Sequence, residues 1–377
     1  MNLKFLSLIL ITAALPSLCS CSGSGSVSAN EGAADTIPLE YATTLTLIDH
    51  GAYSEARIRN PWDSTALLAS YILIPDSIDM PSALPQGTIV RTPLKRSLVY
   101  SSVHVGLAGE LGAAEAVKGV CDADYMTDPA IKARLASGDI ADCGSSMSPD
   151  IERIIALSPD AILLSPYENS TANARLVELG IPIIECADYM ERSPLARAEW
   201  MKFFGLLYGK GETADSLFAV TAREYEGVKR LAADVSSRPS VLFDGLYANQ
   251  WHVPGSNSTL AFFIKDAGGT NPFDIYRKSG SIGLSGEKVL SMAQGADFWF
   301  ARYASAGGMR LDDFIAQHRV YSQFDAAKTG NVYGCNTIAV PFYEEVPFHP
   351  QWFLADLASI LHPELDIKPT HRYFSKL

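Results

Sequence analysis

The chain of 377 residues is 47% hydrophobic and 19% charged, and its formal net charge is −12. This length is more than a single hydrophobic core usually serves, so we expect two lobes. The excess of acidic residues argues against nucleic acid as a partner, because nucleic-acid binding depends on basic patches.

Residues 1–20 predict a signal peptide. Lys4 precedes the apolar run Phe5–Leu15, which is too short to span a bilayer permanently. The tetrad Leu18-Cys19-Ser20-Cys21 resembles a bacterial lipobox, with cleavage before Cys21 and a lipid on its sulfur. An ordinary secretory signal with an incidental cysteine is the alternative. We therefore expect a periplasmic protein that is anchored to a bacterial membrane at Cys21 and meets the membrane only through that lipid.

Two segments precede the main body of the chain. Residues 21–38 are mostly small and polar, which predicts a flexible tether. Residues 39–87 predict a strand-rich N-terminal extension, with strands at Thr43–Ile48 and Leu67–Ile74 and a turn at Asn60-Pro61 between them.

Strands then alternate with helices over residues 88–192, which predicts an α/β lobe with a parallel sheet. A loop is expected at Asp122–Pro129. The expected strands are Leu98–Tyr100, Val117–Cys121, Ile140–Cys143, Ala161–Leu164 and Ile181–Glu185, and the expected helices are Val103–Leu111, one at Glu152, and Ala172–Leu179.

Residues 193–235 are continuously helix-friendly and predict a helical linker. Ser193 is expected to cap its first helix, with Pro194 at the first helical position. Gly209 and Gly211 predict a break, followed by one long helix from about Glu212. Such a helix between two lobes would act as a strut and limit hinge bending.

Residues 236–377 predict a second α/β lobe. A loop is expected at residues 244–258. The expected strands are Ser240–Phe243, Phe298–Ala301 and Asn331–Cys335, and the expected helices are 259–266, one at Glu287, Leu311–His318 and Pro350–Leu361.

Four cysteines follow Cys21, and none forms a C-x-x-C pair, which argues against a zinc knuckle. An oxidising compartment permits a disulfide between Cys121 and Cys143. Buried free cysteines that act as small hydrophobes are the favoured interpretation, and this includes Cys186 and Cys335.

Asp150–Ser165 and Leu284–Phe300 share a helix–strand element. Each begins with a short helix opened by an acidic residue, Glu152 or Glu287, and ends in an apolar strand. The helix macrodipole favours a carboxylate at that place. The two residues therefore predict either a docking face with one carboxylate from each lobe or two carboxylates that only suit the helix dipole.

The chain resembles the helical-backbone metal-chelate receptors, which are substrate-binding proteins of ABC importers for iron complexes and cobalamin. The resemblance covers about residues 88–365. Its motifs are I-E-R-I at 151–154 with S-P-D at 158–160, A-G-G-T-N at 267–271, and the closing Asp356-Leu357 and Leu361-His362-Pro363.

That resemblance implies a class III periplasmic binding protein fold, in which two Rossmann-like lobes are joined by a long rigid helix. It also implies a shallow ligand cleft, a small closure on binding, a monomer and no cofactor. Glu152 and Glu287 match the positions that pair with arginines of the ABC permease, which works with its ATPase.

In open α/β sheets ligands bind outside the carboxyl ends of the strands, so the loops that follow strands are candidates. Aromatic residues dominate these loops, and a tyrosine offers a flat apolar face and a polar tip suited to a chelate or macrocycle. Arg302 is the expected cation for an anionic group, and His104 is a candidate contact of the ligand or its metal. The expected ligand-binding residues are Tyr125, Tyr167, Tyr189, Tyr247, Trp251, Tyr303, Arg302 and His104.

This set, with one arginine, fits haem or a corrinoid at least as well as a siderophore, and the resemblance to receptors for iron complexes is what implies a siderophore. The expected ligand is therefore an iron(III) complex, either a siderophore or haem, and cobalamin is the alternative. A bare zinc or manganese receptor would need His104, His252 and Glu344 to converge, but the sequence has no H-x-H or H-x-x-x-H motif. A secreted enzyme is the alternative of another class. It is disfavoured because no Gly-x-Ser-x-Gly elbow or phosphate-binding glycine loop follows a strand.

Overall fold

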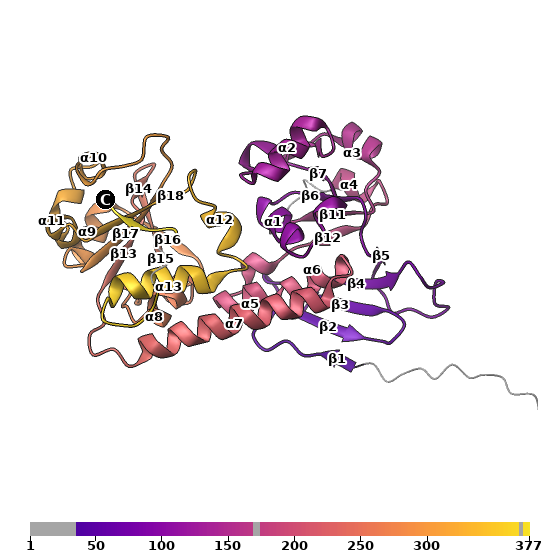
Figure 1. The fold of residues 1–377 in the computed structure, drawn as a ribbon, viewed down its shortest axis with the longest axis horizontal. Coiled ribbons are helices and arrows are strands. Elements are labelled where there is room, and N and C mark those ends of the chain that lie inside the picture. Colours follow the sequence, from indigo (N-terminus) through magenta and orange to yellow (C-terminus); the bar gives the residue numbers. More distant parts are fainter. Residues whose placement is uncertain (1–34, 169–173, 369–371) are drawn as a thin grey trace, which may run out of the picture. The chain divides into compact units, whose positions relative to one another are not determined.

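The computed structural model describes residues 35–168, 174–368 and 372–377. The expected signal peptide, Cys21 and the tether as far as residue 34 lie outside these residues. Residues 34–377 form one compact unit. Its helices and strands are drawn in Figure 1. Among the described helices, none combines the length and the apolar character that a bilayer span requires.

The N-terminal extension is a five-stranded sheet in the order β1-β2-β3-β4-β5. Neighbouring strands are antiparallel except β4 and β5, which are parallel. Successive side chains along a strand point to opposite faces of the sheet, so β2 buries Leu45 and Leu47 and exposes Thr46. The two expected strands are present, and three more join them. Two of these three, β1 and β5, lie just outside the expected bounds of the extension, residues 39–87. The strands are β1 (Asp35–Ile37), β2 (Leu45–Asp49), β3 (Ser54–Arg59), β4 (Leu67–Pro75) and β5 (Thr88–Thr92).

The first lobe holds a fully parallel sheet in the order β12-β11-β6-β7-β8, as expected. The expected loop at Asp122–Pro129 is interrupted by a 3-10 turn at Ala123–Tyr125, and an unexpected helix, α2, begins at its end. Asp128 caps α2 with Pro129 at its first position, which is a local signal that the sequence did carry. The strands are β6 (Ser97–Val99), β7 (Val117–Val120), β8 (Ala141–Asp142), β11 (Ala161–Leu164) and β12 (Ile183–Glu185), and the helices are α1 (Ser102–Glu110), α2 (Pro129–Ser137), α3 (Ile151–Leu157) and α4 (Ala174–Val177). A small hairpin, β9 (Gly144–Ser145) with β10 (Ser148–Pro149), follows β8.

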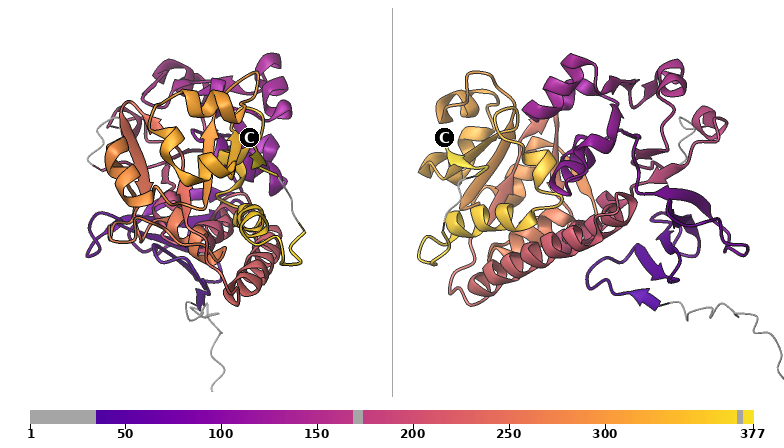
Figure 2. Two further views of the ribbon diagram at one scale, coloured as in Figure 1. Left: turned by 90° about the vertical axis from the view of Figure 1, so that its left-hand side faces the viewer. Right: turned by 45° about the vertical axis from the view of Figure 1, so that its right-hand side comes forward.

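The helical linker consists of α5 (Pro194–Glu199), α6 (Met201–Leu207) and α7 (Gly211–Ala233). The Ser193 side chain accepts a hydrogen bond from the Ala196 N–H, so the expected cap is confirmed. The break is also confirmed, because Gly209 adopts a φ of +64° between α6 and α7. α7 has 23 residues, and α13 lies alongside it in both views of Figure 2.

The second lobe has the sheet β13-β17-β18-β19, parallel except for the short C-terminal β19. The expected loop at 244–258 is wrong in part, because a hairpin occupies it. Ala248 and Asn249 both have positive φ, as a two-residue hairpin turn requires. The strands are β13 (Val241–Phe243), β14 (Leu246–Tyr247), β15 (Gln250–Pro254), β16 (Ser281–Leu284), β17 (Phe298–Tyr303), β18 (Val332–Asn336) and β19 (Ser375–Lys376), and the helices are α8 (Thr259–Asp266), α9 (Gly286–Ala293), α10 (Leu311–Ala316), α11 (Asp325–Thr329), α12 (Phe342–Glu345) and α13 (Pro350–Leu361).

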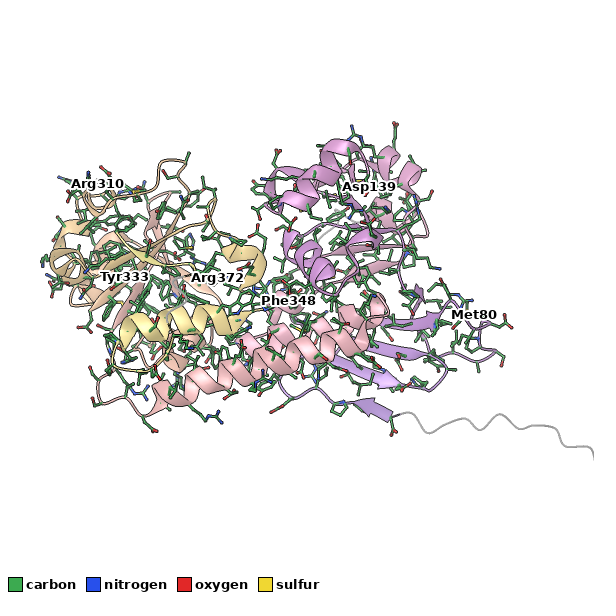
Figure 3. The ribbon with its side chains drawn as sticks, viewed as in Figure 1. Met80, Asp139, Arg310, Tyr333, Phe348 and Arg372 are labelled. Atoms are coloured by element: carbon green, nitrogen blue, oxygen red, sulfur yellow. The ribbon has the colours of Figure 1, made fainter. Side chains whose placement is uncertain are left out.

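The cores of the lobes are joined through the linker. Phe348, from the second half of the sequence, belongs to the first lobe's hydrophobic core and packs edge-on against Phe204 of α6. Figure 3 labels Phe348 between the two lobes. The extension shares that same core, since Leu45, Leu47 and Tyr71 pack in it. The two lobes are therefore held by a common apolar hinge region.

The four described cysteines, Cys121, Cys143, Cys186 and Cys335, are buried and free. The favoured interpretation of these residues as small hydrophobes is confirmed, and the Cys121–Cys143 disulfide is absent from the structure. Burial raises the pKa of the Cys121 thiol to about 12. Cys121 is therefore an uncharged thiol at neutral pH.

Candidate ligand-binding site

An aromatic cavity of about 460 Å³ lies at the carboxyl ends of β6, β7 and β11 in the first lobe. Tyr125, Met147 and Tyr167 line it and keep 73%, 74% and 63% of their surfaces exposed, which is unusual for such apolar side chains. Tyr100 is buried and also lines it. Burial raises the pKa of the Tyr100 hydroxyl well above its ordinary value, so this group remains a protonated donor.

Asp122 holds the rim of the aromatic cavity. It lies two residues after the end of β7 and has a left-handed backbone with φ of +52°. Its N–H donates to the Gly144 carbonyl at 2.8 Å, and its Oδ1 accepts from the Ser146 N–H at 3.1 Å. Both partners belong to the β9–β10 hairpin, which carries Met147 between its two strands. The hairpin is thus fixed to the strand end, and Met147 is presented to the cavity.

A second cavity, of about 520 Å³, lies at the carboxyl ends of β13 and β17 in the second lobe. Arg302 is held there by Asp244, with Nε donating to Oδ1 at 2.8 Å and Nη2 to Oδ2 at 2.5 Å. The guanidinium also lies over the rings of Phe342 and Tyr343, 5.6 and 5.7 Å from their centroids. Burial would lower the pKa of Arg302, but the paired Asp244 carboxylate raises it, so the group is a fixed cation.

A third cavity, of about 660 Å³, opens between the lobes. One wall comes from α1 and the start of α2, and the other from the segment 338–341 with Glu344 and Glu345. Two polar contacts bridge the lobes beside it. Thr127 Oγ1 donates to Glu344 Oε1 at 3.0 Å, and His349 Nε2 lies 2.5 Å from Glu110 Oε2. The cavity and the aromatic one share Ser102 and Met126, so they are adjacent.

Three of the expected ligand residues, Tyr125, Tyr167 and Arg302, line these cavities. The Tyr189 hydroxyl donates to the carbonyl of Pro166, the residue before Tyr167. Tyr247 is 78% exposed at the β14–β15 hairpin and, like Tyr189, lines none of the three cavities described above.

Two of the expected contacts are corrected. Trp251 was expected on a loop but lies in β15, is fully buried, and donates from Nε1 to the Phe243 carbonyl at 2.8 Å. The hairpin turn places it on the inner face, where its ring stacks on Trp299. His104 is 2% exposed in α1 and lies 2.9 Å from Asp188 through Nε2, so it is a core residue here.

Tyr303 is the last expected ligand residue and lies partly exposed at the end of β17. An added Cβ at Gly334 of β18 would lie 2.8 Å from the Tyr303 ring, so this ring covers the glycine. Tyr303 also lines none of these three cavities.

Several cavity residues were missed from the sequence. Asp244 follows β13 directly and Asp122 lies two residues after β7, and this position near a strand end was a usable signal. Met147 lies in a hairpin that is too short to show a strand periodicity in the sequence. Arg197 belongs to the linker and not to a loop that follows a strand.

The structure does not assemble a bare metal site. His252 lines the second-lobe cavity, Glu344 lines the interlobe cavity, and His104 is paired in the core. Among the described residues, no group of three His, Cys, Asp or Glu side chains could hold a metal ion. The zinc or manganese alternative therefore has no support in the geometry.

Glu152 and Glu287 are exposed in the first turns of α3 and α9. Asp150 and Ser285 cap these helices. The Glu287 backbone N–H and the Ser285 hydroxyl lower the pKa of the Glu287 carboxyl. The expected helix-start geometry is present in both lobes, while docking to a permease stays a prediction.

The family model for periplasmic binding proteins matches residues 99–339. The chain belongs to this family. It is therefore a substrate-binding protein and not an enzyme, and binding proteins of this family deliver their ligands to ABC permeases.

Individual proteins and solved structures are also similar to this chain. An uncharacterized lipoprotein of Methanocaldococcus jannaschii is 29% identical over 297 residues, which is 73% of this chain and 67% of that protein. A possible iron-binding periplasmic solute-binding protein of Staphylococcus epidermidis has a TM-score of 0.57 at 16% identity, covering 72% of this chain and 100% of its own. The periplasmic heme-binding protein RhuT of Roseiflexus has a TM-score of 0.54 at 19% identity, covering 70% and 99%. The expected class III fold is confirmed.

Proposed function

We propose that this periplasmic binding protein captures an iron(III) complex, a siderophore or haem, and delivers it to the permease of an ABC importer. The observation that carries the proposal is the combination of exposed aromatic side chains in one cavity with a fixed cation in another. Exposed Tyr125, Tyr167 and Met147 line the first-lobe cavity, and the fixed cation Arg302 lines the second-lobe cavity. A flat, partly anionic chelate fits such a combination.

Two further parts of the proposal concern delivery. Glu152 and Glu287 dock the protein on the permease, one from each lobe. A lipid on Cys21 keeps the protein at the membrane in the periplasm, and the described relative from Methanocaldococcus jannaschii is itself called a lipoprotein.

The test is a titration of the protein with four coloured complexes: haem, a ferric catecholate, a ferric hydroxamate and cyanocobalamin. Binding is followed by absorbance and by quenching of tryptophan fluorescence. We expect haem or one of the ferric complexes to bind most tightly. If cyanocobalamin binds most tightly, the proposed ligand is a corrinoid and not an iron(III) complex.

Variants then locate the ligand. Tyr125→Ala with Tyr167→Ala removes two rings, each worth on the order of 1 kcal/mol in stacking, so the double variant should bind roughly tenfold or more weakly. Tyr247→Ala is the matched control, because Tyr247 is as exposed but lines no described cavity. An affinity of the double variant within twofold of the wild type would contradict the assignment of the aromatic cavity.

A further inference from the structure

Arg197 of the linker lines the same second-lobe cavity as Arg302. It lies in α5, between the lobes, and its Nε donates to Asp188 Oδ2 at 3.0 Å. Its side chain is 25% exposed, whereas Asp188 is 1% exposed. The carboxylate therefore fixes the guanidinium from the buried side, while the remaining part reaches the cavity.

The hydrogen bonds leave donors of both arginines free for a ligand. Asp188 uses only Nε of Arg197, and Asp244 uses only Nε and Nη2 of Arg302. Within the described part of the chain, neither Nη group of Arg197 nor Nη1 of Arg302 makes a hydrogen bond. Two guanidinium groups are thus pre-oriented on one cavity, which reduces the entropy cost of holding an anion.

A purely structural role would make Arg197 only the counter-ion of buried Asp188. His104 already occupies the other carboxylate oxygen, at 2.9 Å from Oδ1. Burial would raise the pKa of Asp188, but His104 and Arg197 lower it, so the carboxylate is ionised and compensated. The role of counter-ion uses only Nε of Arg197 and does not explain why the same side chain lines the cavity.

We infer that Arg197 is a second anion-binding residue of the ligand site and that the captured chelate carries acidic oxygens, such as carboxylates or catecholates, which contact Arg302 and Arg197 together. This inference rests on the proposed function and deepens it, because it selects anionic chelates over neutral ones. The ligand then contacts the linker as well as both lobes.

The test uses the full chain and the same four complexes. Haem and the ferric catecholate are anionic, while the ferric hydroxamate and cyanocobalamin are neutral overall. We expect an anionic complex to bind most tightly and Arg197→Gln to weaken it at least tenfold (about 1.4 kcal/mol). Affinity for the neutral complexes should stay within twofold.

Two further variants separate binding from folding. Arg197→Lys keeps a cation beside Asp188 but loses the planar fork, so it should restore thermal stability and only part of the affinity. Arg192→Gln, at an exposed arginine directly before the linker and outside the described cavities, is the matched control and should bind like the wild type.

The inference is overturned if a neutral complex binds most tightly, if Arg197→Gln leaves the anionic affinity within twofold, or if it weakens anionic and neutral complexes equally. The tyrosine variants distinguish a failure of this inference from a failure of the proposed function. Loss of binding in the Tyr125 and Tyr167 double variant with no response to Arg197→Gln would retain the function and remove only the linker contact.

Discussion

Replacement of Glu199 should release the N-terminal extension from the linker. Glu199 lies in α5 and is fully buried. Its Oε1 accepts from the Glu40 N–H at 2.9 Å, and its Oε2 accepts from the N–H groups of Tyr41 and Ala42 at 2.7 and 2.8 Å. Lys202 Nζ lies 3.3 Å from Oε1. One carboxylate therefore holds the segment between β1 and β2 against α5 of the linker.

The magnitude follows from these contacts. Glu199→Ala leaves three backbone donors without their acceptor, and each unsatisfied donor costs about 1–3 kcal/mol. Because the segment 40–42 is partly exposed, water can reach some of these groups, and the lower bound applies. We therefore expect a loss of about 3 kcal/mol, similar to other losses of a partner from a buried charged group. Glu199→Gln keeps one acceptor oxygen and should lose about half as much.

The assay is urea unfolding followed by tryptophan fluorescence, combined with limited proteolysis of the segment before β2. Glu199→Ala should unfold at lower urea and be cut faster in that segment. Glu224→Ala, on the exposed side of α7, is the control and should match the wild type. A loss below about 1 kcal/mol in Glu199→Ala, or an equal loss in the control, would refute the reasoning.

Three other outcomes are expected. Cys21→Ala should give an unlipidated protein that stays in the aqueous phase on detergent phase separation, and partition with membranes would exclude the lipid anchor. Glu152→Ala and Glu287→Ala should each reduce stimulation of the transporter ATPase and leave ligand affinity unchanged, because each removes a carboxylate that would pair with the permease; full stimulation by the double variant would contradict docking. Burial raises the pKa of the Glu185 carboxyl in the folded protein. The stability contributed by the protonated carboxyl is therefore fully present below the ordinary pKa of glutamate and is lost as pH rises through the raised pKa of the folded state. Glu185→Gln should therefore raise the Tm at pH 7 more than at pH 4, and equal shifts at both would argue against this ionisation.

The parts of the site that could be predicted are those where a local rule applies. Tyr125 and Tyr167 follow strands of a parallel sheet, Arg302 lies at the carboxyl end of β17, and these strand ends do form the cavities. The same rule predicted Trp251 as a loop residue that contacts the ligand. This prediction was wrong, because a two-residue turn makes its segment a strand. Its side chain then belonged to the inner face, and a single-residue change of register would have exposed it.

The sequence by itself determined the alternation of strands and helices, the cap at Ser193 and the break at Gly209, because these depend on neighbouring residues and on backbone preferences. Only the tertiary structure decided which side chains meet. Arg197 and Arg302 are about a hundred residues apart and line one cavity, and Glu199 binds the backbone at Glu40, 159 positions away. Such contacts follow from how the lobes, linker and extension pack, and no periodicity in the sequence encodes them.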